Sequence, residues 1–332
     1  MNRSAGGPVV IAGSSGLVGR ALVAELRRRG ATVLRLVRRP AAADDEITWD
    51  PAAGSLDAAA LEGAGAVVNL AGAGIGDRRW NADRKQLLRD SRTRSAALLA
   101  AVVSDLSRPP EAILSASAIG FYGQRGDSVV TESGGPGRGF LAELCQEWEA
   151  AAQPEAAVRT VLLRTGLVLS ADGLFLRRQL PLFKLGLGGR LGPPDRWVSW
   201  ISLTDTVAAV CHLLGSDASG PVNVTAPDPV TNADFTRALG RALRRPAVLA
   251  VPLLLPGLLL GSEAVAGLTQ SARVVPEALL ADGFEFEHPD VATALAAALG
   301  RPPAGTYHGR GASQRAMILP RVQVSKPNPP SR

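Results

Sequence analysis

A glycine-rich segment near the N-terminus constrains the fold of this chain more than any other feature. Gly13, Gly16 and Gly19 stand three residues apart, after an apolar run at 9–11 and at the start of a stretch with helical periodicity. A buried strand, a tight turn and a helix in this order make an anion site, because the helix N-terminus attracts phosphate and glycine lets the backbone come close to it. We predict that the whole turn binds the pyrophosphate of a dinucleotide, through Gly13, Ser14, Ser15, Gly16, Leu17, Val18 and Gly19.

Apolar strands alternate with amphipathic helices over most of the sequence. This alternation predicts an α/β fold with a Rossmann-type doubly wound parallel sheet, followed by a smaller, mainly helical C-terminal substrate lobe. The predicted strands are residues 9–11, 32–37, 64–70, 112–116, 159–169 and 221–225. The predicted helices are residues 17–29, 83–103, 140–152, 202–214 and 231–243.

Three segments differ in composition. Residues 8–228 are expected to form the dinucleotide-binding domain and residues 246–300 a small C-terminal domain. Residues 301–332 are rich in proline, glycine and arginine without periodicity, which predicts a disordered basic tail. A glycine-rich loop at 182–194 is a candidate substrate lid. The apolar stretch 247–260 is too short to span a bilayer, so we expect a buried or substrate-facing element and no membrane partner.

Charge and cysteine content exclude several classes of function. The chain has 36 basic and 30 acidic residues, and the six basic residues after Gly300 equal the whole excess, so residues 1–300 are formally neutral. We therefore expect no nucleic-acid partner. Two isolated cysteines, Cys145 and Cys211, and three scattered histidines give neither a disulfide framework nor a metal site. Without a signal-peptide pattern we expect a cytoplasmic protein, and no pattern indicates an oligomeric state.

The residues after the second predicted strand indicate which dinucleotide binds. NAD sites usually place an acidic residue there for the ribose 2′-hydroxyl. This chain has Arg38 and Arg39 instead, and guanidinium groups suit a 2′-phosphate. We therefore predict NADP(H), with NADPH preferred over NADH. The alternative is that both arginines are solvated surface residues.

Several sequence blocks between about residue 9 and residue 299 carry a family resemblance. They include the glycine turn, Arg79-Trp80-Asn81, the segment 115–123, Trp148-Glu149, the segment 164–169, Ser199-Trp200-Ile201 and the segment 220–227. With these blocks the chain resembles the extended short-chain dehydrogenases/reductases. It is most similar to their atypical subgroup of epimerase family proteins, which are NAD-dependent epimerase/dehydratase-like and carry a small C-terminal domain of unknown function.

The resemblance implies which further residues hold the cofactor. Leu70, Ala71 and Gly72, at the end of a predicted strand, would line its adenine and ribose side. Arg92 would approach the cofactor from the following helix, and Leu167 would lie beside the nicotinamide. An ordinary surface position on the helix is the alternative for Arg92.

The same resemblance raises a question about catalysis. Ordinary members of the superfamily use a serine or threonine with a Tyr-x-x-x-Lys pair, in which the lysine lowers the pKa of the tyrosine for proton transfer. With Glu149 as the landmark, the tyrosine position falls on Leu141 and the lysine position on Cys145. The predicted helix contains neither tyrosine nor lysine. The atypical subgroup shares this departure.

Three hydroxyl groups remain near the expected nicotinamide position, those of Ser115, Ser117 and Tyr122, and the last two are the catalytic candidates. Ser117 would hydrogen-bond a substrate oxygen, and Tyr122 would protonate a carbonyl oxygen. Packing against the end of the sheet is an equal alternative for Tyr122. Asp205 is expected to cap the helix that follows it rather than to act as a base.

The sequence therefore predicts an NADP(H)-binding oxidoreductase or epimerase-like enzyme with an unidentified small-molecule substrate. The alternative is a non-catalytic NADP(H)-binding protein that senses redox state or serves a partner. Its basis is the missing Tyr-Lys pair beside an intact cofactor turn.

Overall fold

The computed structural model describes residues 6–247, 249–251 and 261–300, and an eight-stranded sheet forms its centre. The strands are short, and most of their residues are buried because helices cover both faces. They are β1 (Val9–Ala12), β2 (Val33–Val37), β3 (Glu46–Asp50), β4 (Ser55–Leu56), β5 (Ala66–Asn69), β6 (Ala112–Ala118), β8 (Arg159–Thr165) and β13 (Gly220–Val224).

The order of these strands in the sheet is β13-β8-β6-β5-β1-β2-β3-β4. Every neighbouring pair is parallel except β3 and β4. The order runs outward from β1 in both directions, so the connections reverse between β1 and β5. Open α/β sheets bind their ligands at such a reversal, beyond the carboxyl ends of the strands.

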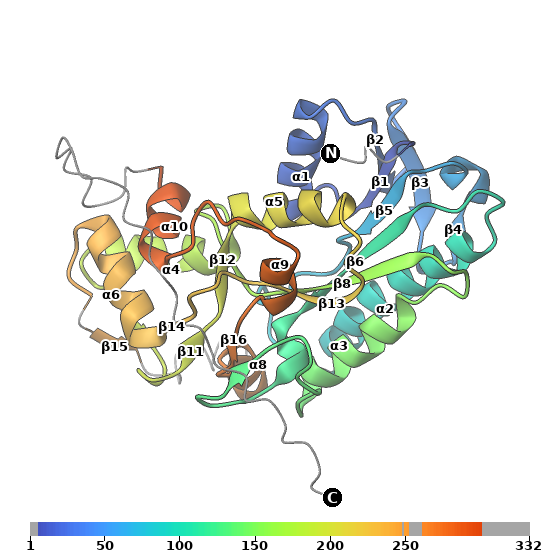
Figure 1. Cartoon of the computed structure of the whole chain (residues 1–332). Helices are drawn as coiled ribbons and strands as arrows, with labels where there is room; N and C mark the ends of the chain where they lie inside the picture. Colours follow the sequence, from blue (N-terminus) through green and yellow to red (C-terminus); the bar gives the residue numbers. More distant parts are fainter. Residues whose placement is uncertain (1–5, 248, 252–260, 301–332) are drawn as a thin grey trace, which may run out of the picture.

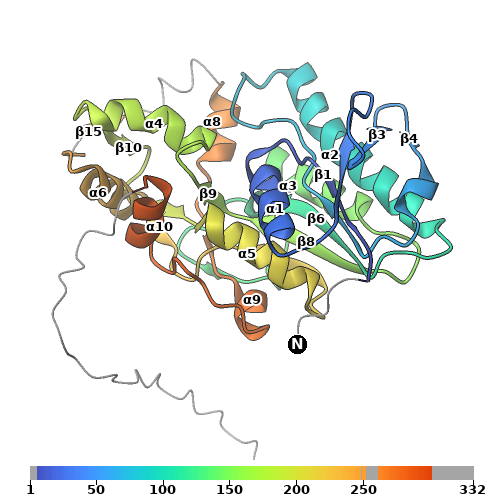
Figure 2. The ribbon, with the colours of Figure 1, turned by 90° about the horizontal axis from the view of Figure 1, so that it is seen from above.

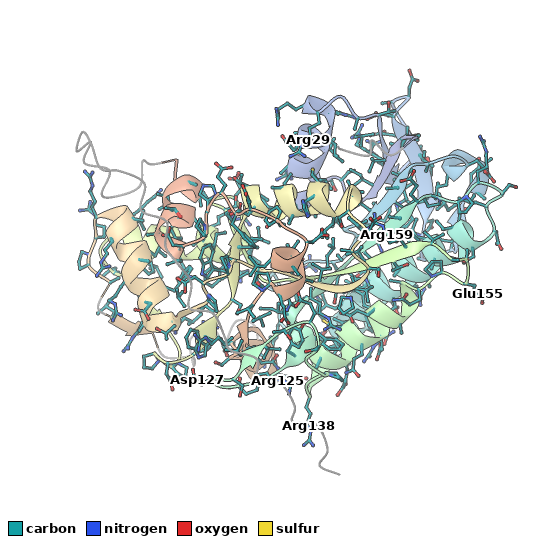
Figure 3. All side chains as sticks on the ribbon, viewed as in Figure 1. Arg29, Arg125, Asp127, Arg138, Glu155 and Arg159 are labelled. Carbon is teal, nitrogen blue, oxygen red and sulfur yellow. The ribbon has the colours of Figure 1, made fainter. Side chains whose placement is uncertain are left out.

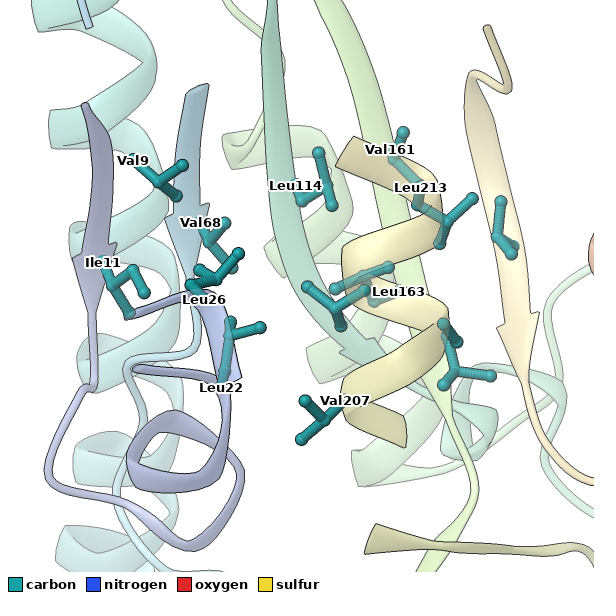
Figure 4. Packing of buried hydrophobic residues seen from close by; sticks show 14 of the residues in the cluster. Val9, Ile11, Leu22, Leu26, Val68, Leu114, Val161, Leu163, Val207 and Leu213 are labelled. Atoms are coloured by element: carbon teal, nitrogen blue, oxygen red, sulfur yellow. The ribbon is translucent and has the colours of Figure 1, made fainter. Parts of the chain in front are cut away.

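Four long helices cover the sheet in two layers (Figure 1). One layer is α1 (Leu17–Arg28) with α5 (Leu203–Leu214), and the other is α2 (Ala82–Ser104) with α3 (Phe140–Ala151). Between sheet and helices lie side chains such as Ile11, Leu22 and Val207 (Figure 4), and each contributes about 1.5–3 kcal/mol by burial. This doubly wound arrangement confirms the predicted fold class.

The second part of the chain builds the opposite end of the molecule from β3 and β4 (Figures 1 and 2). Strand β9 pairs with β12, β11 with β14, and β10 with β15, each over two or three residues. These elements and their helices are β9 (Leu167–Leu169), α4 (Leu174–Lys184), β10 (Gly189–Leu191), β11 (Trp197–Val198), β12 (Trp200–Ser202), β14 (Val230–Thr231), α6 (Asn232–Leu243) and β15 (Leu249–Val251).

The C-terminal region is smaller and mainly helical, as expected, but its described residues form no core of their own. It contains α8 (Ser262–Leu268), β16 (Arg273–Val274), α9 (Glu277–Ala281) and α10 (Val291–Ala298), and β16 pairs with β7 (Val129–Val130). Its buried side chains enter four separate clusters of the core. Examples are Ala264, Val274, Leu279 and Leu295, one in each cluster.

Most predicted elements match the structure within one or two residues, and a few differ for physical reasons. The single strand predicted at 159–169 is broken at Gly166, where a Cβ would lie 2.7 Å from the carbonyl oxygen of Ser199, so the chain continues as β9. The proposed lid at 182–194 consists of the end of α4, a turn and β10. Strands β3 and β4, helix α4 and the 3₁₀ turns η1 (Ala58–Leu61) and η2 (Ile119–Tyr122) were not predicted.

Two expectations fall on residues that the structure does not describe. The predicted tail at 301–332 and most of the apolar stretch 247–260 lie outside the described residues. Within the described part of the chain, no helix is both long and apolar enough to cross a membrane.

Candidate cofactor and active site

The turn between β1 and α1 has the backbone shape of a phosphate cradle. Gly13 has a φ of 78°, and a Cβ at this position would lie 2.5 Å from the carbonyl oxygen of Leu70. A Cβ at Gly19 would overlap the carbonyl oxygen of Gly13, so α1 can approach the turn only with glycine there. The N–H of Gly16 closes the turn by donating to the carbonyl oxygen of Gly13 at 3.0 Å.

Helix α1 begins at this turn without a side-chain cap. Its N-cap is Gly16, and its first turn contains no acidic residue. The first N–H groups of α1 are therefore left for a ligand, and the helix dipole favours an anion. Ser15 and Gly16 are exposed, whereas Ser14 is buried. The turn thus fits a pyrophosphate.

The two arginines beyond β2 differ in their surroundings. Arg39 donates through both terminal nitrogens to Glu46, at 2.7 and 2.6 Å, and these hydrogen bonds hold the pKa of Glu46 at about 2. Arg38 is exposed, and its side chain has no hydrogen bond or ion pair within the described residues. Arg38 therefore has its charge free for a phosphate, whereas the charge of Arg39 is already neutralised.

The loop after β5 lies directly against the glycine turn. The carbonyl oxygen of Leu70 faces Gly13, and the N–H of Ala71 donates to the side chain of Asn69 at 3.1 Å. A Cβ at Gly72 would come within 3.3 Å of the Cζ atom of Arg92. The structure therefore places Leu70 and Ala71 against the glycine turn, and Gly72 follows in the same loop with Arg92 against it.

Arg92 is a partly buried cation on α2. It donates to the carbonyl oxygens of Leu88 and Ala73, at 3.0 Å each, and its guanidinium lies 5.2 Å from the ring centroid of Trp148. Burial lowers the pKa of Arg92, and no acidic side chain pairs with it in the described part of the chain. A positive charge without a carboxylate partner at the end of β5 suits an anionic ligand.

Leu167 lies at the carboxyl end of β8, in the first position of β9. It pairs with Trp200 and is partly buried. After β9 the chain passes the start of α1, because a Cβ at Gly173 would lie 3.4 Å from Leu17. The turn after β1 and the segment after β9 thus meet at the start of α1. Arg38 follows β2, which neighbours β1 on the side away from β5.

A buried polar network crosses the sheet at the ends of β6 and β8. Glu149, on α3, accepts a hydrogen bond from Ser117 at 2.6 Å and two from Arg164 at 2.8 Å each. Arg164 also donates to the hydroxyl oxygen of Tyr122 at 3.0 Å. That hydroxyl in turn donates to the side-chain oxygen of Asn223 at 2.7 Å.

Both predicted catalytic hydroxyls donate their hydrogen bonds within this network, Ser117 to Glu149 and Tyr122 to Asn223. Tyr122 has no exposed surface, and burial raises its pKa. Ser117 is 5% exposed. This arrangement does not bring the hydroxyl of Tyr122 to a surface where a substrate could contact it, and it makes the Ser117 oxygen an acceptor only. The catalytic role of both residues stays a prediction.

Leu141 and Cys145 occupy the positions of the missing Tyr-Lys pair on α3, and both are buried. Burial raises the pKa of the Cys145 thiol to about 12, so the thiol carries no charge near neutral pH. Cys145 therefore cannot supply the positive charge that a lysine would place there.

Asp205 is not the helix cap that the sequence predicts. The N-cap of α5 is Ser202, whose hydroxyl oxygen accepts the N–H of Asp205 at 2.9 Å. The fully buried carboxylate of Asp205 accepts the N–H groups of Glu287 and His288 at 2.8 and 3.0 Å, which ties α5 to the segment before α10. No group of three or more potential metal ligands occurs among the described residues.

Glu149, Arg164 and Asn223 are the site residues whose contacts sequence reasoning missed. A signal was present for two of them. Glu149 follows Leu141 and Cys145 at four-residue spacing, which puts a carboxylate on the buried face of a helix, and Arg164 interrupts an apolar strand. Asn223 carried no such signal, because its partner Tyr122 is far away in the sequence.

An open helix N-terminus at the reversal of a doubly wound sheet defines a dinucleotide-binding protein of the Rossmann class. The chain belongs to the NAD dependent epimerase/dehydratase family, whose model matches residues 9–226. A second model, a domain of unknown function, matches residues 251–298.

The alignment with this chain covers nearly the whole length of two related proteins. An epimerase family protein of Mycobacterium bovis is 47% identical over 89% of this chain and 98% of its own. The human epimerase family protein SDR39U1 is 32% identical over 86% of this chain and 98% of its own.

Solved structures agree with this assignment. The structure of human SDR39U1 with NADPH aligns with a TM-score of 0.81 at 30% identity, over 88% of this chain and 99% of that chain. A nucleoside-diphosphate sugar epimerase from Corynebacterium glutamicum aligns with a TM-score of 0.71 at 36% identity, over 90% of this chain and 60% of that chain.

Proposed function

We propose that the chain is an NADP(H)-dependent oxidoreductase, or an epimerase-like enzyme using the same cofactor, that acts on a small molecule at the carboxyl ends of the parallel strands. The observation that carries the NADP(H) assignment is the unpaired guanidinium of Arg38, just beyond the carboxyl end of β2, which neighbours the strand that leads to the uncapped start of α1. The NADPH in the structure of human SDR39U1 supports the same choice.

The bound nicotinamide would supply or accept a hydride. The backbone of residues 13–19 would hold the pyrophosphate, and Arg38 would pair with the 2′-phosphate. Arg92 would stabilise negative charge beside Gly72. Leu167 would pack against the nicotinamide and exclude water from it.

Ser117 is the residue that we propose to orient the substrate. Because its proton goes to Glu149, its remaining lone pairs can only accept a hydrogen bond. Ser117 would therefore hold a substrate hydroxyl rather than a carbonyl, which favours an alcohol as the group to be oxidised. Tyr122 could take part only if its contacts with Arg164 and Asn223 opened.

A non-catalytic NADP(H)-binding protein is the second candidate, and a specific observation favours it. Leu141 and the uncharged Cys145 stand where a proton-transfer pair would be, and both remaining hydroxyls are tied into the core. Such a chain would bind the cofactor and report its redox state to a partner.

Fluorescence titration with NADPH and NADH, followed by nicotinamide absorbance with a panel of alcohols and carbonyl compounds, separates the two candidates. Turnover that falls in Ser117→Ala supports the enzyme and the role of Ser117. An unchanged rate in Ser117→Ala or Tyr122→Phe removes that residue from the site.

Tight NADPH binding without turnover across the panel overturns the enzyme and supports the second candidate. Tighter binding of NADH than of NADPH overturns the NADP(H) assignment.

A further inference from the structure

One end of the molecule carries most of the exposed apolar side chains. Among the described residues seven large apolar side chains are exposed, and four of them form what we call the leucine patch: Leu182, Leu185, Leu187 and Leu249. Leu185 is 73% exposed and Leu187 is 53% exposed. Figures 1 and 2 both show the elements that carry the patch, α4 and β15, beside α6 at one end of the molecule.

The cap of α4 holds the leucine patch in a fixed shape. Gly186 has a φ of 77°, and its N–H donates to the carbonyl oxygen of Phe183 at 3.0 Å. The N–H of Leu187 donates to the carbonyl oxygen of Leu182 at 2.9 Å, which completes a Schellman motif. Leu249 joins the patch because β15 pairs with β10, with Leu249 opposite Gly189. Leu185 and Leu187 therefore belong to an ordered turn, and Leu182 and Leu249 belong to the helix and the strand beside it.

A group of arginines borders the leucine patch. We call these residues the arginine rim: Arg237, Arg241, Arg244 and Arg245, which line a hollow of about 430 Å³ at the end of α6. Arg245 joins the rim to the patch by donating to the carbonyl oxygen of Lys184 at 3.0 Å. Arg244 has a φ of 55°, the only positive value for a non-glycine residue in the described part of the chain. A basic side chain thus stands where the backbone favours glycine.

The charge of the molecule is concentrated at the same end. Residues 166–202 and 225–251, which build this end, contain nine basic and four acidic residues, a net charge of plus five. Because residues 1–300 are neutral as a whole, the rest of them carry a net charge of minus five. An uneven distribution of this size gives the leucine end a positive potential and the remainder a negative one.

The sequence alone predicts no membrane partner, because no segment is long enough to span a bilayer. From the surface of the folded chain we propose instead that this end of the molecule binds the surface of an anionic lipid bilayer. The leucine patch enters the headgroup region, and Arg241, Arg244 and Arg245 of the rim pair with lipid phosphates, whereas Arg237 already pairs with Asp234. This is the pattern of proteins that lie on a membrane without crossing it. A bilayer fits better than a folded protein, because none of the exposed large apolar side chains in the described residues is aromatic. Protein interfaces favour aromatic anchors that fill pockets.

Vesicle sedimentation with the full chain tests the proposal. We expect binding to mixed phosphatidylcholine–phosphatidylglycerol vesicles, weaker binding at high salt, and little binding to pure phosphatidylcholine. Leu185→Ser with Leu187→Ser is expected to weaken binding about tenfold or more. Arg241→Gln with Arg244→Asn is expected to weaken it about 30-fold, because two charges leave the surface.

Matched variants elsewhere in the chain serve as controls. Leu87→Ser with Leu280→Ser removes two leucines of 48% and 51% exposure outside the patch. Arg108→Gln with Arg138→Gln removes two charges away from α6, and Arg138 projects from the edge beneath α3 (Figure 3). Both controls are expected to bind vesicles like the unmodified chain. NADPH affinity, unchanged in all variants, reports that each still folds.

Three results would overturn the proposal. One is no binding to anionic vesicles. Another is equal binding by the Leu185/Leu187 variant, which would assign the binding to the basic residues 301–332 instead. The third is a concentration-dependent dimer that the leucine variant abolishes, without vesicle binding, which would make a second copy of the chain the occupant.

Discussion

Two arginines that look equivalent in the sequence have different surroundings in the folded chain. Arg38 is exposed and unpaired within the described residues, whereas Arg39 is held by Glu46. We expect Arg38→Gln to weaken NADPH binding about 10- to 100-fold, because charge-assisted hydrogen bonds contribute about 1.5–3 kcal/mol, with little effect on NADH. Arg39→Gln is expected to have a smaller effect. Fluorescence titration measures both, and equal losses for NADPH and NADH would contradict the assignment.

The buried pair of Glu149 and Arg164 is expected to matter for stability. Glu149→Gln leaves the guanidinium of Arg164 in the interior without a carboxylate, which costs about 3–5 kcal/mol. Glu147→Gln is a matched control on the same helix, because Glu147 pairs with Arg89 at the surface. Urea unfolding is expected to show a change below about 1 kcal/mol for this control. Similar losses in the two variants would mean that the buried pair has no special role.

At the level of elements, charged pairs attach β3 to β2. Arg35 holds the pKa of Asp45 at about 2, and Arg39 holds that of Glu46 at about 2, compared with ordinary values of 3.8 and 4.5. A carboxyl group whose pKa is lowered by folding stabilises the fold above its unfolded pKa, and this contribution is lost as the pH falls through the folded pKa. The contribution of these two carboxylates to stability is therefore complete above about pH 4.5 and is mostly lost as the pH falls to about 2.

Thermal melts across this pH range test the attachment. Asp45→Asn with Glu46→Gln is expected to lower Tm at about pH 7 and to have a much smaller effect near pH 2, where the carboxyl groups of the folded, unmodified chain are about half protonated. Asp44→Asn, at an exposed neighbouring position, is the control and is expected to leave Tm unchanged. A difference in Tm that stays as large at the lowest pH would show that these charges do not carry it.

Elements with a clear apolar period could be predicted from the sequence, and so could the part of the site that the backbone forms. The turn from Gly13 to Gly19 is local, so its residues alone specify its shape. Strand β3 is short and rich in charge, and its pairing depends on partners in β2. The Tyr122–Asn223 contact joins residues about a hundred positions apart, and the path of the C-terminal region depends on similarly distant packing. No local pattern encodes such contacts.

For the whole molecule, the C-terminal region and the final segment are expected to behave differently when removed. Deleting residues 301–332 is expected to leave NADPH affinity and Tm unchanged. Deleting residues from Ser262 onward removes buried side chains such as Val274, Leu279 and Leu295 from separate core clusters. At about 2–5 kcal/mol for each large side chain, the loss of these three alone is as large as a typical folding free energy of about 5–15 kcal/mol. Soluble yield and NADPH titration check both deletions. A folded product of the longer deletion would show that the rest of the chain does not depend on the C-terminal region.

The path of the C-terminal region also fixes when the protein can complete its folding in the cell. Chains emerge from the ribosome with the N-terminus first, and many domains fold as soon as they are outside. Here α9 packs on β13, and Leu279 belongs to the same core cluster as Ile11, so we expect this cluster to be complete only after α9 has been synthesised. For the same reason, recombination cannot exchange the C-terminal region as an independent module.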